Sequence, residues 1–213
     1  MTRFRKRTVL LSQKPIVQKQ SRYLFAAAVV YFAGLIWGAA GVRGNGEFLP
    51  LFAENLISLR QTSGFGMVCA SVFLSFFVLL FAAFLSGASP FGLPVLGILP
   101  FVQGMGTGCV SAYLVLHTGM QGIWTELLIF FVPDALMSLL LIGYISKAAD
   151  TSVKLFLIHV VQRKNTCARL EDLIRLFLLA SSAALGLSLL AGGLNHLFSD
   201  LLSSPPAASF LSV

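Results

Sequence analysis

The polar residues with the greatest potential for chemistry are Asp134 and Gln103, because both stand inside long apolar runs of the sequence. A carboxylate at the centre of a membrane helix costs about 2.5 to 3.5 kcal/mol on insertion scales, so its presence needs an explanation. Pro133 directly precedes the acid and has no amide proton, which predicts a kink or a local opening of the helix there. Gln103 is placed at a similar depth and can hydrogen-bond Asp134, especially if the acid is protonated.

Two interpretations of Asp134 are open. In a transporter it would be a proton or cation site, since acids inside membranes are by default functional candidates. In the other interpretation it makes a structural polar contact between helices. We favour the structural contact, because the sequence offers no second acid and no basic partner at the same depth.

Patterns typical of enzymes are missing from the sequence. The three histidines, His117, His159 and His196, are scattered over different segments, so their spacing does not suit a metal site. The chain has no glycine-rich phosphate loop followed by Lys, no nucleophile elbow and no HExxH pattern. Its three cysteines are too few for a disulfide framework. We therefore expect no enzyme activity, no cofactor, no metal site and no small-molecule substrate.

The elements that position these residues must be membrane helices. The chain has 213 residues, of which 57% are apolar and only 11% charged, and its mean hydropathy is +0.87, which is too apolar for a soluble domain. Backbone amides in lipid find no water, so apolar runs of this length should be α-helical. We predict an all-α polytopic bundle with five transmembrane helices at about residues 23–42, 65–86, 93–116, 123–145 and 174–197.

Positive charge predicts the orientation of this 23–197 transmembrane domain. All but two of the 15 Lys and Arg residues lie in segment 1–22 or between Lys147 and Arg175. The positive-inside rule places both segments in the cytoplasm, which puts the short tail 198–213 outside. The basic N-terminal segment is thus explained by topology and attraction to anionic membrane lipids rather than by nucleic acid binding.

Two connecting segments have amphipathic character. In the predicted external loop 43–64, apolar residues recur at helical spacing, which predicts a short helix that caps the bundle, rests on lipid or docks a protein partner. The candidate partner surface consists of Phe48, Leu51, Phe52 and Leu56. The run Leu155 to Val161 is too short to cross the membrane and is flanked by basic residues, so we expect a helix lying on the inner membrane surface.

Small residues recur every four positions in two of the predicted spans. Gly34 and Gly38 stand in the first, and Gly104 and Gly108 in the third, where Gly106 adds a further notch. Such rows allow helix backbones to approach closely, which is how helices associate when lipid removes the hydrophobic drive. We interpret these glycines as helix-packing positions, with a pore or substrate path as the alternative.

The order of these features resembles the stage II sporulation protein M family of endospore-forming bacteria. The resemblance is carried by the segment Tyr31 to Gly38 with its two glycines, by the approach Phe91-Gly92-Leu93-Pro94 with Gln103-Gly104 and Gly108 after it, by Gly119 and Gly122, and by Pro133 in the fourth span. Family members often have Lys where Gln103 stands, and different residues where Asp134 follows the proline. These departures leave open a broader relative that is not devoted to sporulation.

The resemblance implies a non-enzymatic scaffold in the mother-cell membrane at the sporulation septum. Such a scaffold would anchor and localise a peptidoglycan-degrading pair resembling stage II sporulation proteins D and P during engulfment of the forespore. Its docking surfaces would be loop 43–64, link 117–122 and the outer tail. The alternative from another class is a small transporter or permease subunit that uses Asp134.

Overall fold

The computed structural model describes residues 2–43, 51, 53–55, 57–58, 64–125, 130–159 and 170–198. Side chains are described from Ser21 onwards, except those of Thr118, Gln121, Gly122, Trp124 and Thr125. All regular structure in these residues is helical, and its long elements are α1 (Thr2–Arg43), α3 (Phe65–Gly87), α4 (Leu93–Thr125), α5 (Val132–His159) and α6 (Leu170–Leu197).

Each long helix contains a stretch that is long and apolar enough to cross a membrane. The five spans are Ser21–Arg43, Phe65–Gly87, Leu93–His117, Val132–His159 and Leu170–Leu197. The chain is therefore an all-α polytopic membrane bundle, and the prediction of five spans is confirmed. Its orientation in the membrane, with the N-terminus inside, stays a prediction.

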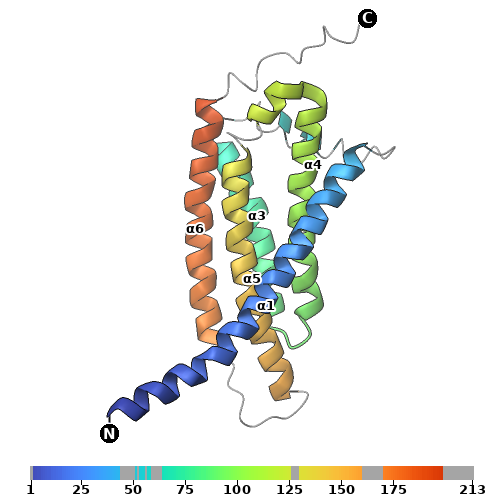
Figure 1. The fold of residues 1–213 in the computed structure, drawn as a ribbon. Helices are drawn as coiled ribbons and strands as arrows, with labels where there is room; N and C mark the ends of the chain where they lie inside the picture. The colour runs from blue at the N-terminus through green and yellow to red at the C-terminus, as the bar shows by residue number, and fades with distance from the viewer. Residues whose placement is uncertain are drawn as a thin grey trace, which may run out of the picture.

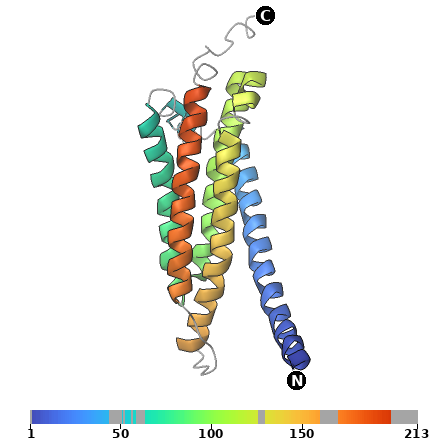
Figure 2. The same cartoon turned by 90° about the vertical axis from the view of Figure 1, so that its left-hand side faces the viewer.

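The helices run up and down and gather around α5 (Figure 1). We call the end where α1 and α6 finish the top end, and the end where residues 88–92 join α3 to α4 the bottom end. The central helix α5 contacts each of the other four and is the most buried of the spans, whereas α6 is the least buried. Helix α1 crosses α4 obliquely and lies at the edge of the bundle (Figures 1 and 2).

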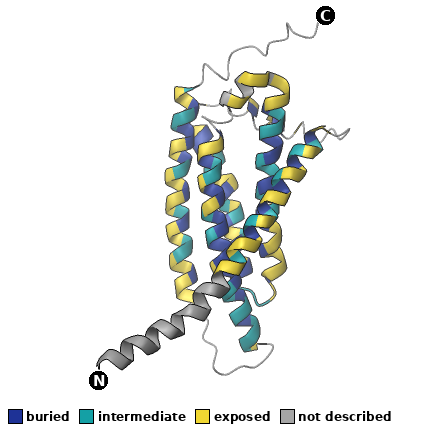
Figure 3. Cartoon of the chain, in the orientation of Figure 1, coloured by how far each residue is buried: buried dark blue, intermediate teal, exposed yellow. Residues whose placement is uncertain are grey.

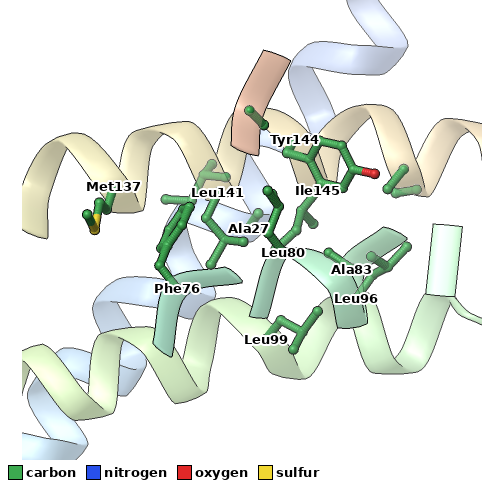
Figure 4. Packing of buried hydrophobic residues seen from close by; sticks show 14 of the residues in the cluster. Ala27, Phe76, Leu80, Ala83, Leu96, Leu99, Met137, Leu141, Tyr144 and Ile145 are labelled. Atoms are coloured by element: carbon green, nitrogen blue, oxygen red, sulfur yellow. The ribbon is translucent and has the colours of Figure 1, made fainter. Parts of the chain in front are cut away.

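The main hydrophobic core lies where α3, α4 and α5 face one another. Leu80 of α3 and Leu141 of α5 are fully buried there, and Leu99 of α4 packs into the same cluster. Figure 4 shows Leu80 between the ribbons of α4 and α5. The outward faces of the helices carry many exposed leucine, valine and phenylalanine side chains (Figure 3), as expected of a surface that contacts lipid acyl chains.

The α3–α4 hairpin turns tightly at the bottom end. The amide of Ser89 donates to the Ser86 carbonyl at 3.2 Å, and the Gly92 amide donates to the Ser89 carbonyl at 3.3 Å. A Cβ atom at Gly92 would overlap the Ser86 carbonyl oxygen, so the turn requires glycine at this position. The hairpin therefore fixes the bottom ends of α3 and α4 next to each other.

The fourth span differs from its predicted bounds of 123–145. Helix α4 continues through link 117–122 to Thr125, with a break at Gly119 (φ 58°, ψ −132°), and α5 begins at Val132, after the π-helical Phe130 and Phe131. Glycine tolerates this positive φ without the strain that a Cβ atom brings. The sequence between residues 123 and 131 is apolar apart from Thr125 and Glu126, so composition did not mark where one helix gives way to the next.

The expected surface helix over Leu155 to Val161 is wrong for Leu155 to His159, which form the last turns of α5. Three features support this extension. The buried Ser152 hydroxyl donates to the Ser89 carbonyl at 2.7 Å, and Phe156 meets Phe91 edge to face at 6.0 Å between ring centroids. Lys154 also pairs with Asp150 one turn earlier at 2.6 Å. Residues 160–161 lie outside the described residues, as does the tail from 199 onwards.

Candidate functional site

A cavity of about 350 Å³ lies between α3, α4 and α5, within the membrane-spanning part of the bundle. Its polar lining combines a carboxyl group, an amide and three hydroxyls, from Asp134, Gln103, Thr107, Ser71 and Ser75. Its apolar lining is Val72, Phe76, Leu79, Val102, Val110, Phe130 and Met137, and Gly106 completes it. The structure thus brings Asp134 and Gln103, which the sequence singled out, to the wall of one cavity.

The backbone around Asp134 departs from regular α-helix. Phe130 and Phe131 have π-helical geometry, and Pro133 follows them, fully buried. Proline cannot donate a hydrogen bond to the preceding turn, and wide turns of this kind are a known response to an interrupted ladder. The structure places the half-buried Asp134 directly after this opening, on the wall of the cavity.

Hydroxyl groups on the cavity wall donate to their own helices. The Thr107 hydroxyl donates to the Gln103 carbonyl at 3.2 Å, and the Ser71 hydroxyl donates to the Val68 carbonyl at 2.9 Å. A hydroxyl that donates in this way keeps lone pairs that can accept a hydrogen bond. Together with the carboxyl group of Asp134, these oxygens make the wall rich in acceptors.

Apolar clusters lie above and below the cavity. Towards the top end, Val110 and Phe130 are buried and pack with Ile57 and Leu114. Towards the bottom end, Phe76 and Met137 belong to the main core, and Figure 4 shows the two residues among its members. Among the residues described, the cavity is therefore bounded at both ends by packed apolar side chains.

The side of the cavity between α3 and α4 is open. Ser75 and Val102 line the cavity and are exposed, so they form a mouth on the outer surface of the bundle. The two helices contact each other much less than α1 and α4 do, and they separate above the turn at 88–92 (Figure 2). The mouth lies within two membrane spans and so faces lipid.

The predicted packing glycines lie in a different place, at the crossing of α1 and α4. Gly34 and Gly38 face the carbonyl oxygens of Phe101 and Met105, and a Cβ atom at either glycine would overlap that oxygen. Reciprocally, Gly104 and Gly108 face the carbonyl oxygens of Tyr31 and Leu35. The two backbones are therefore in direct contact, the arrangement that rows of small residues make possible in membranes.

Gly106 differs from its neighbours Gly104 and Gly108. A Cβ atom at Gly106 would meet nothing within 4 Å, and the residue lines the cavity. Two residues turn a helix by about 200°, so Gly106 points away from the face that meets α1. The sequence predicted a further packing notch at Gly106, whereas in the structure this residue faces open space.

The candidate partner surface is only partly described. Leu51 is exposed, while Phe48, Phe52 and Leu56 lie outside the described residues. Residues 51, 53–55 and 57–58 are helical, and among them Ala53 and Ile57 are buried. Ala53 packs on the top ends of α1 and α4, and Ile57 packs on α4 and Phe130. The described part of the segment therefore caps the bundle.

Several residues that shape the site were not found by sequence reasoning. Ser71, Ser75 and Thr107 were overlooked, although they follow the same helical spacing as other cavity residues on α3 and α4. So was a row of small buried residues on α6 at intervals of four, Ala180, Ala184, Ser188 and Gly192, which faces the bundle. That spacing is the signal that identified the glycines of α1 and α4.

Metal chemistry finds no support in the described part of the chain, where no three His, Cys, Asp or Glu side chains gather. His117 and His159 contact the carbonyls of Tyr113 and Leu155 at opposite ends of the bundle. Cys69 and Cys109 are free and buried.

No protein-family model matches this chain, and no curated protein or solved structure shows significant similarity to it.

Proposed function

We propose that this protein is a non-enzymatic membrane scaffold that anchors and localises a peptidoglycan-degrading complex at the sporulation septum during engulfment of the forespore. The proposal starts from the resemblance in motif order to the stage II sporulation protein M family. The partners would be wall-degrading proteins resembling stage II sporulation proteins D and P. The cutting of peptidoglycan would be done by these partners.

The observation that carries the proposal is that the motif glycines lie at a contact between two helices. Gly34, Gly38, Gly104 and Gly108 contribute to the resemblance, and all four bring the backbones of α1 and α4 into contact. These four glycines thus hold the bundle together and do not line the cavity. A fixed bundle suits a protein whose task is to hold others in place.

The top end of the bundle offers a platform for such partners. The helical segment with the exposed Leu51 is held to the bundle through the buried Ala53 and Ile57. The predicted topology places this segment on the wall side of the membrane, where peptidoglycan-degrading partners work. The attachment would present Leu51 and its neighbours at a constant height above the membrane.

A transporter is the second candidate, favoured by the cavity that Asp134 and Gln103 line. Transport needs a path to both sides of the membrane, and packed apolar residues bound this cavity above and below. The two candidates differ in how they respond to Asp134→Asn. This substitution would abolish a proton-coupled transport activity and leave partner capture by a scaffold mostly intact.

The direct experiment is to delete the gene in its native host, induce sporulation and image the cells with a membrane dye. Septa that form but fail to curve around the forespore, with rescue by the wild-type gene, would support the engulfment scaffold. Rescue by Asp134→Asn as well would argue against the transporter. Normal engulfment in the deletion strain would overturn the scaffold proposal.

The orientation is tested with single cysteines at Ser58 and Ser212 and an impermeant thiol reagent, with Cys167 replaced by serine. Ser58 is exposed at the top end, and His159, exposed at the bottom end of α5, supplies the matched internal control. The proposed topology requires that Ser58→Cys and Ser212→Cys react in intact cells and that His159→Cys reacts only after lysis. The reverse pattern would mean that the bundle has the opposite orientation and that the platform does not lie on the wall side.

A further inference from the structure

The cavity between α3, α4 and α5 has features that a scaffold does not need. Its wall contains a carboxyl group and several acceptor oxygens within the membrane-spanning region, where burying polar groups costs free energy. It also has a mouth on the lipid-facing surface. We propose that this cavity binds the ammonium group of a membrane-dissolved amphiphile, which enters sideways between α3 and α4.

The chemistry of the wall selects a cation that can donate hydrogen bonds. Asp134 supplies a carboxyl group, and the hydroxyl oxygens of Ser71 and Thr107 supply acceptors, while no Lys, Arg or His stands among the described lining residues. Phe76 and Phe130 add aromatic rings, whose faces attract ammonium groups. A carboxyl group beside aromatic rings suits an alkylammonium group better than an anion or a neutral sugar.

The route of entry selects an amphiphile over a water-soluble amine. Val110 and Phe130 lie in the upper apolar cluster, and Phe76 and Met137 lie in the core below, so packed side chains bound the cavity along the direction of the spans. The opening is lateral, between Ser75 and Val102. A ligand that is already dissolved in the bilayer reaches this opening without crossing either cluster.

The surface below the mouth suits an alkyl chain. Val78 lies about one turn below Ser75 on α3, and Ile98 lies one turn below Val102 on α4; both are exposed and apolar. The cavity of about 350 Å³ falls in the size range of small-ligand sites and holds an amine head with the first carbons of its chain. The rest of the chain would lie along α3 and α4 in contact with lipid.

Two glycines of α4 provide a matched pair of variants. A side chain added at Gly106 enters the cavity, whereas one added at Gly97 meets nothing within 4 Å on an exposed face outside the cavity. Gly106→Leu therefore fills the cavity, and Gly97→Leu adds the same side chain to the same helix without filling it. Asp134→Asn removes the negative charge at nearly unchanged volume.

The experiment measures thermal unfolding of the purified full-length protein in lipid nanodiscs as dodecylamine is added. Dodecanol is the uncharged probe with the same chain, and butylamine is the short water-soluble probe. We expect dodecylamine to raise the unfolding temperature saturably in the wild type and in Gly97→Leu. Loss of the charge-assisted hydrogen bond in Asp134→Asn should weaken the apparent affinity at least about tenfold, and Gly106→Leu should show no saturable shift.

Three outcomes would overturn the proposal. Equal shifts in Gly106→Leu and Gly97→Leu would mean that dodecylamine does not bind in the cavity. Equal shifts with dodecanol and dodecylamine would mean that the ammonium group is not recognised. Butylamine as effective as dodecylamine would mean that the site takes amines from water, against entry from lipid.

A second measurement keeps the proposal testable if Gly106→Leu does not fold. A dodecylamine analogue with a photoreactive diazirine in its chain is added to the wild-type protein, and the labelled peptides are identified by mass spectrometry. Labelling around Val78 and Ile98 that unlabelled dodecylamine displaces, and dodecanol does not, would support the site. Labelling spread evenly over the outer faces of α3, α4 and α6 would overturn it.

Discussion

Helix α4 meets its two neighbours α1 and α3 in opposite ways. Its contact with α1 is made by glycines that touch backbone atoms. Gly104 and Gly108 lie directly against the carbonyls of Tyr31 and Leu35. Against α3 it diverges from a tight turn and leaves a cavity lined by Gly106. Glycine therefore allows close packing on one face of α4 and leaves a cavity on the other. The outcome depends on which face of the helix each glycine occupies.

The largest expected effect comes from adding a side chain at the contact between α1 and α4. In Gly104→Leu the new side chain meets backbone atoms of α1, which cannot rotate away as a side chain can. We expect a loss of about 3 kcal/mol or more in the free energy of unfolding, the upper end of typical overpacking costs. Unfolding in detergent, followed by circular dichroism, should show it against Gly97→Leu as the matched control.

Equal stability of Gly104→Leu and Gly97→Leu would mean that α1 is free to move away from α4. The contrast between the two sides of α4 would then no longer hold. The reciprocal variant Gly34→Leu tests the same contact from α1, since Gly34 faces the carbonyl of Phe101. It should be destabilised to a similar extent.

A smaller effect is expected at Gly192, where α6 packs on α3. A Cβ atom there would overlap the Cys69 sulfur and approach the Phe65 ring at 3.2 Å. These obstacles are side chains, so Gly192→Ala should cost about 1 to 3 kcal/mol of stability and should be partly rescued by Cys69→Ala. A double-mutant cycle on unfolding free energies measures the rescue, and strict additivity would contradict the contact.

Two serine variants at the bottom end test which interaction holds the α3–α4 turn against α5. Ser152 donates to the Ser89 carbonyl at 2.7 Å across elements, while Ser146, equally buried, donates to the Gly143 carbonyl of its own helix at 2.9 Å. Ser152→Ala removes a tertiary contact and Ser146→Ala removes a local one. We expect Ser152→Ala to lower the unfolding free energy by about 1 kcal/mol more than Ser146→Ala.

Equal unfolding free energies for these two alanine variants would show that the turn is held by packing alone. The contact between Phe91 and Phe156 would then be the main interaction that holds the turn against α5. Phe156→Leu would separate the two contributions, because it keeps apolar volume at the position and removes the ring.

The sequence predicted the spans well where charges or turns bounded them. Arg43 and the turn at 88–92 mark helix ends, because charge and helix-breaking residues interrupt the apolar runs there. The basic residues Lys147 and Lys154 do not end α5, which continues to His159. The boundary between α4 and α5 was not predicted, because few polar residues lie there and the break is at a single glycine, Gly119. Hydropathy alone does not reveal such a break.

The site was predictable only in its most polar members. Asp134 and Gln103 stand out because charged and amide groups are rare inside membranes. Ser71 and Thr107 do not, since hydroxyls often satisfy themselves on their own helix, as these two do. That Gly106 and Gly104 occupy opposite faces follows from helical periodicity, but which face meets α1 depends on tertiary packing.

The smallest expected effect belongs to Gly106→Leu, and it completes the contrast with Gly104→Leu. The new side chain enters open space and removes a glycine from a helix interior, where glycine costs roughly 0.5 to 1 kcal/mol relative to alanine. The unfolding free energy should therefore stay within about 1 kcal/mol of the wild type. A loss as large as that of Gly104→Leu would mean that α3 lies closer to α4 than the cavity allows, and the contrast between the two faces of α4 would not hold. Unchanged stability would show that Gly104 and Gly106, separated by a single residue, have opposite roles. Gly104 allows α1 and α4 to pack closely, and Gly106 leaves space between α4 and α3.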